Sequence, residues 1–241
     1  ADVVFPGEYE QEQGVILFIH GGGWISGSKS GFTSKAISVS KKFNCITASM
    51  NYRYASEKVD CEHILDDIDK TLAKIKDLAQ ARGIKTDKVM LVGYSAGAHL
   101  ALLYSYSRKN TAPIEPAAVV SYSGPADLTS TDFIKNNALS GEDFMLELMS
   151  KLTGETITKS NFNKKKSALL KISPISYVSS SCVPTLIVQG SKDRIVFPTD
   201  TREFAEKLEQ KGVTYRYFEL KNSGHQLKDD PDDFSESNRV L

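Results

Sequence analysis

Six short apolar runs, separated by longer segments, constrain the fold of this 241-residue chain most strongly. They occupy residues 15–19, 45–50, 88–92, 117–122, 185–189 and 214–220. Most lack polar alternation, which is typical of strands covered on both faces. Between the second and third runs, apolar residues recur at three- and four-residue steps over 64–78, which predicts a helix with Ser56 as its N-cap. We therefore predict a mostly parallel central sheet flanked by helices.

The alternation stops between residues 128 and 175. This stretch is largely polar, with one apolar patch around Met145 and Met149. Long stretches without strands are commonly insertions that form lids or binding loops. We predict a single domain over residues 1–241, with a small helical cap inserted at 128–175.

Charge and apolar length exclude several kinds of partner. The chain has 30 Lys plus Arg and 30 Asp plus Glu, so its zero net charge gives no long-range attraction to nucleic acid or anionic lipid. The apolar run 15–19 is far shorter than the roughly 20 residues that cross a bilayer. We expect neither nucleic-acid binding nor membrane insertion.

The cysteines and the start of the chain bear on location. Three widely spaced cysteines favour reduced thiols, and the chain opens at Ala1 without a basic stretch followed by an apolar segment. The expected location is the cytoplasm, with any targeting peptide removed or never present.

Acidic residues on the helix over 64–78 offer no metal site. Asp66, Asp67 and Asp69 point in different directions on a helix, and only His63 lies at ligand spacing. We expect a solvated helix face and no bound metal.

The pentapeptide Gly-Tyr-Ser-Ala-Gly at 93–97 directly follows the run 88–92 and precedes a helix-like segment. A sharp strand-to-helix turn at such a sequence strains the serine backbone, and only small neighbours such as Gly93 and Gly97 leave room for it. The turn would present the Ser95 hydroxyl at the top of the sheet. We predict that Ser95 is a nucleophile.

A second motif, His-Gly-Gly-Gly-Trp at 20–24, follows the run 15–19. Three consecutive glycines suggest a loop that passes close to a ligand and presents its own N–H groups. In acyl transfer, such donors stabilise the developing negative oxygen. We predict an oxyanion hole made by the N–H groups of Gly22, Gly23 and Ala96. A tight turn or a phosphate loop is the alternative, although Lys29 stands one position too late for a phosphate loop.

A serine nucleophile needs a base, and the base needs an acid to orient it. His225 lies in a loop after the last run, and Asp193 lies just after the run 185–189. Loops beyond the carboxyl ends of strands are where open α/β sheets gather ligands. Of the other histidines, His20 is expected to brace the glycine loop and His63 to belong to the helix over 64–78. His99 is expected to point away from Ser95.

These motifs together resemble the α/β-hydrolases, in particular the esterase and lipase branch related to hormone-sensitive lipase. Segments 121–128, 173–175 and 184–193 also resemble the compact bacterial carboxylesterases of that branch, and the resemblance runs from about residue 3 to residue 227. It implies a two-step hydrolysis without metal or organic cofactor. In that reaction Ser95 is acylated, His225 relays the proton and Asp193 orients it.

The expected activity is hydrolysis of small carboxylic esters, including acetyl or feruloyl groups on plant polysaccharide. Only residues 1–5 are assigned ahead of the first core strand, which favours short acyl groups over long-chain lipids. Trp24, Met145 and Met149 are the candidates for the substrate pocket, although each also fits a core position. Two alternatives stay open: an arylformamidase that cleaves N-formylkynurenine, and a catalytically silent hydrolase fold that serves as a small-molecule receptor. The oligomeric state is left open.

Overall fold

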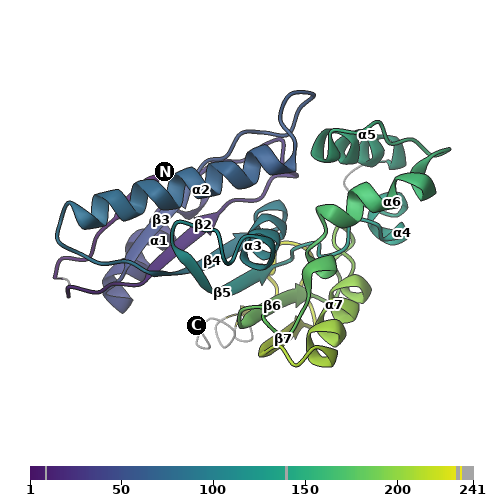
Figure 1. Ribbon diagram of the computed structural model, residues 1–241. Helices are drawn as coiled ribbons and strands as arrows, with labels where there is room; N and C mark the ends of the chain where they lie inside the picture. The colour runs from purple at the N-terminus through teal and green to yellow at the C-terminus, as the bar shows by residue number, and fades with distance from the viewer. Residues whose placement is uncertain (9, 139–140, 232–233, 235–241) are drawn as a thin grey trace.

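The computed structural model describes residues 1–8, 10–138, 141–231 and 234 (Figure 1). In this part of the chain the strands form one seven-stranded sheet in the order β1-β3-β2-β4-β5-β6-β7. Their bounds are β1 Asp2–Val4, β2 Val15–Ile19, β3 Ile46–Met50, β4 Lys88–Tyr94, β5 Glu115–Tyr122, β6 Thr185–Gly190 and β7 Tyr215–Leu220. Strands β2 to β7 run parallel to their neighbours, and β1 pairs antiparallel with β3.

The predicted fold class is confirmed, because each of the six apolar runs forms a strand of a mostly parallel sheet. The sequence analysis missed β1, whose residues Asp2 to Val4 pair with Ser49 to Thr47. A three-residue strand is too short to show a pattern of its own. The segment before the first core strand therefore supplies one antiparallel edge strand.

Helices cover both faces of the sheet. One face carries α2 (Cys61–Gln80), α3 (Ala96–Ser107) and α7 (Pro198–Gln210), and its core includes Leu17 and Ile19 of β2. The other face carries α1 (Ser30–Phe43), whose Ala36 packs in a second cluster with Phe18. The alternation of Leu17, Phe18 and Ile19 between two cores explains why this strand is apolar throughout.

Helix α2 begins later than the sequence suggested. Its N-cap is Asp60, whose carboxylate accepts the His63 N–H over 3.1 Å, while the His63 ring accepts the Asp60 N–H in return. This reciprocal pair is a capping box. The predicted cap, Ser56, is wrong, because Ser56 instead forms an isolated bridge with Val59 ahead of the helix.

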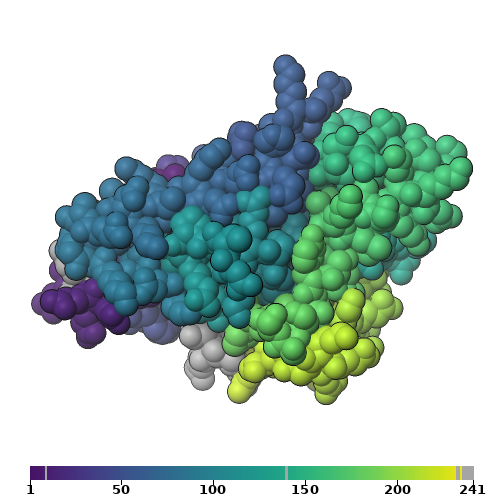
Figure 2. Space-filling view, viewed as in Figure 1, coloured from purple at the N-terminus to yellow at the C-terminus, as the bar shows by residue number. Residues whose placement is uncertain are grey.

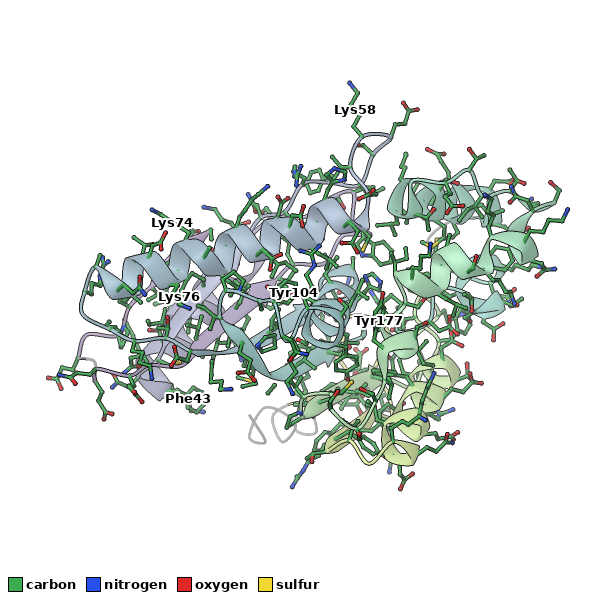
Figure 3. The ribbon with its side chains drawn as sticks, in the orientation of Figure 1. Phe43, Lys58, Lys74, Lys76, Tyr104 and Tyr177 are labelled. Carbon is green, nitrogen blue, oxygen red and sulfur yellow. The ribbon has the colours of Figure 1, made fainter. Side chains whose placement is uncertain are left out.

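The acidic residues Asp66, Asp67 and Asp69 lie on a partly exposed face of α2, where they pair with arginines. Asp67 binds Arg53, while Asp66 and Asp69 bind Arg108 at the end of α3. Tyr104 lies between α3 and α2 (Figure 3), where its hydroxyl donates to Asp69 over 2.5 Å. The contacts of Asp66, Asp69 and Tyr104 attach α2 to α3, whereas Asp67 attaches α2 to the loop after β3.

The described residues of 128–175, which leave out 139–140, form three helices: α4 (Thr131–Lys135), α5 (Glu142–Thr153) and α6 (Phe162–Lys171). A short 3₁₀ helix, η1 (Pro174–Tyr177), then leads back to the sheet at β6. The three helices lie together beyond the ends of the parallel strands and form one side of the molecule (Figures 1 and 2). Among the described residues, no helix combines the length and the apolar character needed to cross a membrane.

A fully buried histidine connects three segments of the fold. Trp24 Nε1 donates to His99 Nδ1 over 3.1 Å, and His99 Nε2 donates to the Ile172 carbonyl over 2.7 Å. Because a carbonyl can only accept, the proton resides on Nε2 and the ring is neutral. His99 thus points away from Ser95, as expected, and ties the glycine loop to the end of α6. Burial lowers the pKa of His99 to about 4.

This buried neutral ring predicts an acid-sensitive stability. The folded pKa of about 4 lies below the ordinary value of 6.5, so the unfolded chain takes up the proton first as the pH falls. The stabilisation is therefore fully present above about pH 6.5 and is lost progressively as the pH falls toward the folded pKa of about 4. Between about pH 7 and pH 5, His99 should lower the free energy of unfolding by about 2 kcal/mol.

The measurement is urea unfolding of wild type and His99→Gln across this pH range. Glutamine does not titrate and keeps a donor and an acceptor. The free energy of unfolding of His99→Gln should therefore fall by about 2 kcal/mol less than that of wild type between pH 7 and pH 5. His20, whose pKa is also lowered by burial, is present in both proteins and cancels in the difference. Parallel slopes for the two proteins would contradict the prediction.

Candidate active site

Ser95 lies at the sharp turn between β4 and α3, with φ 54° and ψ −121°. A positive φ is uncommon for a residue with a side chain and marks stored backbone strain. The turn is held by the Ser95 N–H, which donates to the Tyr122 carbonyl over 2.8 Å. A Cβ on Gly97 would lie 2.1 Å from the Ile19 carbonyl oxygen, and one on Gly93 would lie 2.2 Å from the Gly97 oxygen. Glycine is therefore required at both positions.

The predicted nucleophile, base and acid lie in one hydrogen-bonded series. Ser95 Oγ is 2.9 Å from His225 Nε2, and His225 Nδ1 is 2.8 Å from Asp193 Oδ2. Because a carboxylate only accepts, Nδ1 carries the ring proton and Nε2 is left to accept from the serine hydroxyl. This is the tautomer that a general base facing a serine requires.

Asp193 is buried, and its carboxylate is fully hydrogen-bonded. Oδ1 accepts the N–H groups of Ile195 and Val196 over 2.9 and 3.1 Å. Oδ2 accepts Gln189 Nε2 over 2.9 Å in addition to His225. These donors fix the carboxylate and compensate the cost of burying its charge. The loop after β6 therefore presents the acid in one orientation.

The glycine loop turns its backbone back on itself beside Ser95. Gly22 and Gly23 have φ values of 116° and 59°, and the Ser26 N–H donates to the Gly22 carbonyl over 3.0 Å. A Cβ on Gly22 would lie 2.2 Å from the Ser26 oxygen, whereas Gly23 faces open space. Among the described residues, the N–H groups of Gly22, Gly23 and Ala96 have no acceptor. Unused donors at this place are suited to bind an oxyanion.

His20 braces this loop from behind, as the sequence analysis expected. Its Nδ1 donates to the Gly21 carbonyl over 2.7 Å, and its ring stacks on Tyr52 with the centroids 4.3 Å apart. The Tyr52 hydroxyl in turn donates to the His20 carbonyl over 3.0 Å. The glycine loop is thus held by a buried pair of rings that takes no part in the series at Ser95.

A cavity of about 610 Å³ opens onto Ser95, His225 and the glycine loop. Its apolar wall comes from α4, α5, the glycine loop and the loop after Asp193: Trp24, Ile25, Phe133, Phe144, Met145, Leu148, Ile195 and Val196. No Lys, Arg, Asp or Glu is among the described residues that line it. A larger cavity of about 740 Å³ lies on the sheet face covered by α1 and contains none of Ser95, His225 and the glycine loop. The chemistry therefore belongs to the smaller cavity.

The predicted pocket residues divide. Trp24 and Met145 line the cavity, but Met149 does not: it lies one turn further along α5 and is fully buried in the core. The assignment of Met149 to the substrate pocket is therefore wrong. Sequence reasoning missed Phe144 and Leu148, although they belong to the same apolar patch and flank Met145 on its helix face.

The part of the chain that the structure describes provides no metal site at this cavity. Among the described residues, no group of three or more His, Cys, Asp or Glu side chains is arranged to hold an ion. The three cysteines are free thiols, and Cys61 is fully buried. Besides the Ser95 hydroxyl and the His225 ring, the described residues that line the cavity contribute the polar side chains of Ser26, Tyr94, Asn137 and Gln226.

Comparison with known proteins finds esterases among the relatives of this chain. The family model described as BD-FAE matches residues 1–208. The chain is 27% identical to Esterase LipQ of Mycobacterium tuberculosis, over 88% of its own length and 49% of LipQ. It is 25% identical to the probable carboxylic ester hydrolase LipM of the same organism, over 81% of its length and 45% of LipM. The chain thus spans about half the length of these curated relatives.

Solved structures of esterases share the fold. Esterase B of Lactobacillus rhamnosis superposes with a TM-score of 0.78 at 19% identity, covering 99% of this chain and 79% of that one. Esterase Est2 of Thermogutta terrifontis superposes with a TM-score of 0.72 at 19% identity, covering 99% of this chain and 83% of Est2. A truncated carbohydrate esterase from gut microbiota superposes with a TM-score of 0.74 at 17% identity, covering 98% of this chain and 90% of that esterase. The resemblance to α/β-hydrolase carboxylesterases is confirmed, and the chain belongs to the BD-FAE family.

Proposed function

We propose that this chain is a serine carboxylesterase that hydrolyses small, neutral esters through an acyl-enzyme on Ser95. The observation that carries the proposal is the 2.9 Å hydrogen bond from Ser95 Oγ to His225 Nε2, at a strained turn facing unused N–H groups. Esterase relatives support the same reaction class.

In the first step Ser95 Oγ attacks the ester carbonyl carbon while its proton passes to His225 Nε2. The carbonyl oxygen becomes negative and accepts hydrogen bonds from the N–H groups of Gly22, Gly23 and Ala96. His225 then gives the proton to the departing alcohol, leaving an acyl group on Ser95. Water, deprotonated by His225, attacks this acyl group, and collapse returns the proton to Ser95 Oγ and releases the acid.

The cavity supports a neutral substrate with an apolar or aromatic part. Phe133, Phe144 and Met145 offer an apolar wall, and no described lining residue carries a fixed charge. Its volume of about 610 Å³ falls within the range usual for small-ligand sites. Acetyl and feruloyl esters of polysaccharide meet these requirements, and one structural relative is described as a carbohydrate esterase.

The two alternatives are less well supported. N-formylkynurenine carries a carboxylate and an ammonium group, and among the described lining residues none is a charged partner for either. A silent receptor has no use for a serine hydroxyl hydrogen-bonded to a correctly oriented histidine. Ester hydrolysis therefore accounts for more of the observed geometry.

Removing the nucleophile or the base should abolish most of the esterase activity. Ser95→Ala and His225→Ala should each lower kcat for 4-nitrophenyl acetate by roughly three to six orders of magnitude, and by similar amounts, because the two groups act as a unit. Ser105→Ala is the matched control: this buried serine lies on the same helix α3, and its Oγ has no hydrogen-bond partner in the described chain. Wild-type rates in Ser95→Ala would overturn the assignment.

Two methionines of α5 distinguish the cavity from the core. Met145→Ala should enlarge the cavity and raise the ratio of octanoate to acetate hydrolysis, because Met145 lines it. Met149→Ala should lower the free energy of unfolding by about 2–5 kcal/mol and leave this ratio unchanged, because Met149 is fully buried away from the cavity. Chain-length profiles of 4-nitrophenyl esters and urea unfolding provide the two readouts. A shifted profile in Met149→Ala alone would contradict the assignment.

A further inference from the structure

The main-chain carbonyl of His225 accepts two side-chain hydroxyls. Tyr94 OH and Ser123 Oγ each lie 3.0 Å from this oxygen. Tyr94 ends β4 and directly precedes Ser95, and Ser123 directly follows β5. A carbonyl oxygen has two lone pairs, so both are occupied.

We infer that Tyr94 and Ser123 are positioning residues that hold the base through its main chain, an inference that rests on the proposed esterase function. The hydrogen bond to Asp193 orients the His225 ring, but it does not fix the position of the His225 backbone in the loop after β7. The two hydroxyls attach that backbone to β4 and β5, the neighbouring strands that border the serine turn. A displacement of about 1 Å at a reacting group costs orders of magnitude in rate, so this attachment has catalytic consequences.

The loop that carries His225 is also anchored ahead of the ring, where the Lys192 N–H donates to the Ser223 carbonyl over 3.0 Å and ties it to the loop after β6. Leu227 has a positive φ of 56°, and its N–H donates back to Gly224 within the same turn over 3.2 Å. That bond shapes the turn and does not connect it to the sheet. The Tyr94 hydroxyl links the backbone of the base directly to β4, the strand that leads to Ser95, and the Ser123 hydroxyl links it to the end of β5.

Ser123 is built for this contact. It is fully buried and has a positive φ of 50°, and its N–H donates to the Val188 carbonyl over 2.9 Å. A left-handed conformation is uncommon for serine, which indicates that the surrounding structure imposes it. In this conformation the hydroxyl reaches from the end of β5 to the His225 carbonyl. Ser123 does not line the substrate cavity.

Tyr94 lies between the glycine loop and the base. Its ring centroid is 5.4 Å from that of His225, and a Cβ on Gly21 would lie 2.9 Å from Tyr94 Cδ1. Burial, followed by the charge of Asp193, raises the pKa of Tyr94 to about 12, so its hydroxyl is a proton donor at neutral pH. The residue before the nucleophile thus contacts the two loops that must meet around the ester.

The test compares Ser123→Ala, Tyr94→Phe and the double variant with 4-nitrophenyl acetate. Each single variant should lose roughly fivefold in kcat, because the carbonyl keeps one donor, and the double variant should lose more than the product of the two. KM should stay unchanged in Ser123→Ala, which does not touch the cavity. Ser121→Ala and Tyr106→Phe are matched controls, since Ser121 Oγ has no partner in the described chain and Tyr106 OH binds Thr185.

A second readout does not depend on esterase activity. The proton between His225 Nδ1 and Asp193 should give a downfield ¹H NMR signal that is absent from His225→Gln. It should broaden or vanish in the double variant and persist in the controls. Unchanged kcat and an unchanged proton signal in both single variants and in the double variant would overturn the inference. If the double variant does not fold, unchanged kcat and an unchanged signal in the two single variants overturn it. A wild type that cleaves no ester but whose signal weakens in the double variant would overturn the proposed function while supporting the positioning role.

Discussion

The close approach of the turn at Ser95 to the end of β2 is the constraint on which the rest of the site depends. Gly97, at the start of α3, lies so near the carbonyls of Ile19 and His20 that a Cβ would meet them at 2.1 and 2.5 Å. Ser95 and the glycine loop are therefore set against each other by backbone packing. Because β2 and β4 are neighbouring parallel strands, the sheet itself brings the Ser95 hydroxyl to the donors of that loop.

The site separates chemistry from recognition. Polar contacts gather on the strand side, where the carboxylate of Asp193 accepts bonds from His225, Gln189 and two backbone N–H groups. Apolar side chains gather opposite, from α4 and α5 and the loop after Asp193. The buried ring of His99 ties the glycine loop to the end of α6, because it binds both Trp24 and the Ile172 carbonyl. An uncharged cavity selects by shape and desolvation, which suits esters without formal charge.

The sequence was most informative where the physical signal is local. Buried strands of a parallel sheet are continuously apolar, so all six runs could be found, and the spacing of Gly93, Ser95 and Gly97 predicts the turn. Ser56 failed as a cap because the competing Asp60 stands four residues later in a capping box. Met149 failed because a patch of adjacent apolar residues does not reveal which of them turns to a cavity. The hydroxyls of Tyr94 and Ser123 meet His225 across more than one hundred residues, a contact that no local pattern contains.

The central claim is that Ser95 is a nucleophile activated by His225, and covalent trapping tests it most directly. Wild type, Ser95→Ala and His225→Ala are each incubated with an activated phosphonate ester, and the adducts are mapped by peptide mass spectrometry. The account predicts a single adduct on Ser95 in wild type, none at any position in Ser95→Ala, and strongly slowed labelling in His225→Ala. Labelling of another serine at the wild-type rate in Ser95→Ala, or no adduct in wild type, would contradict it.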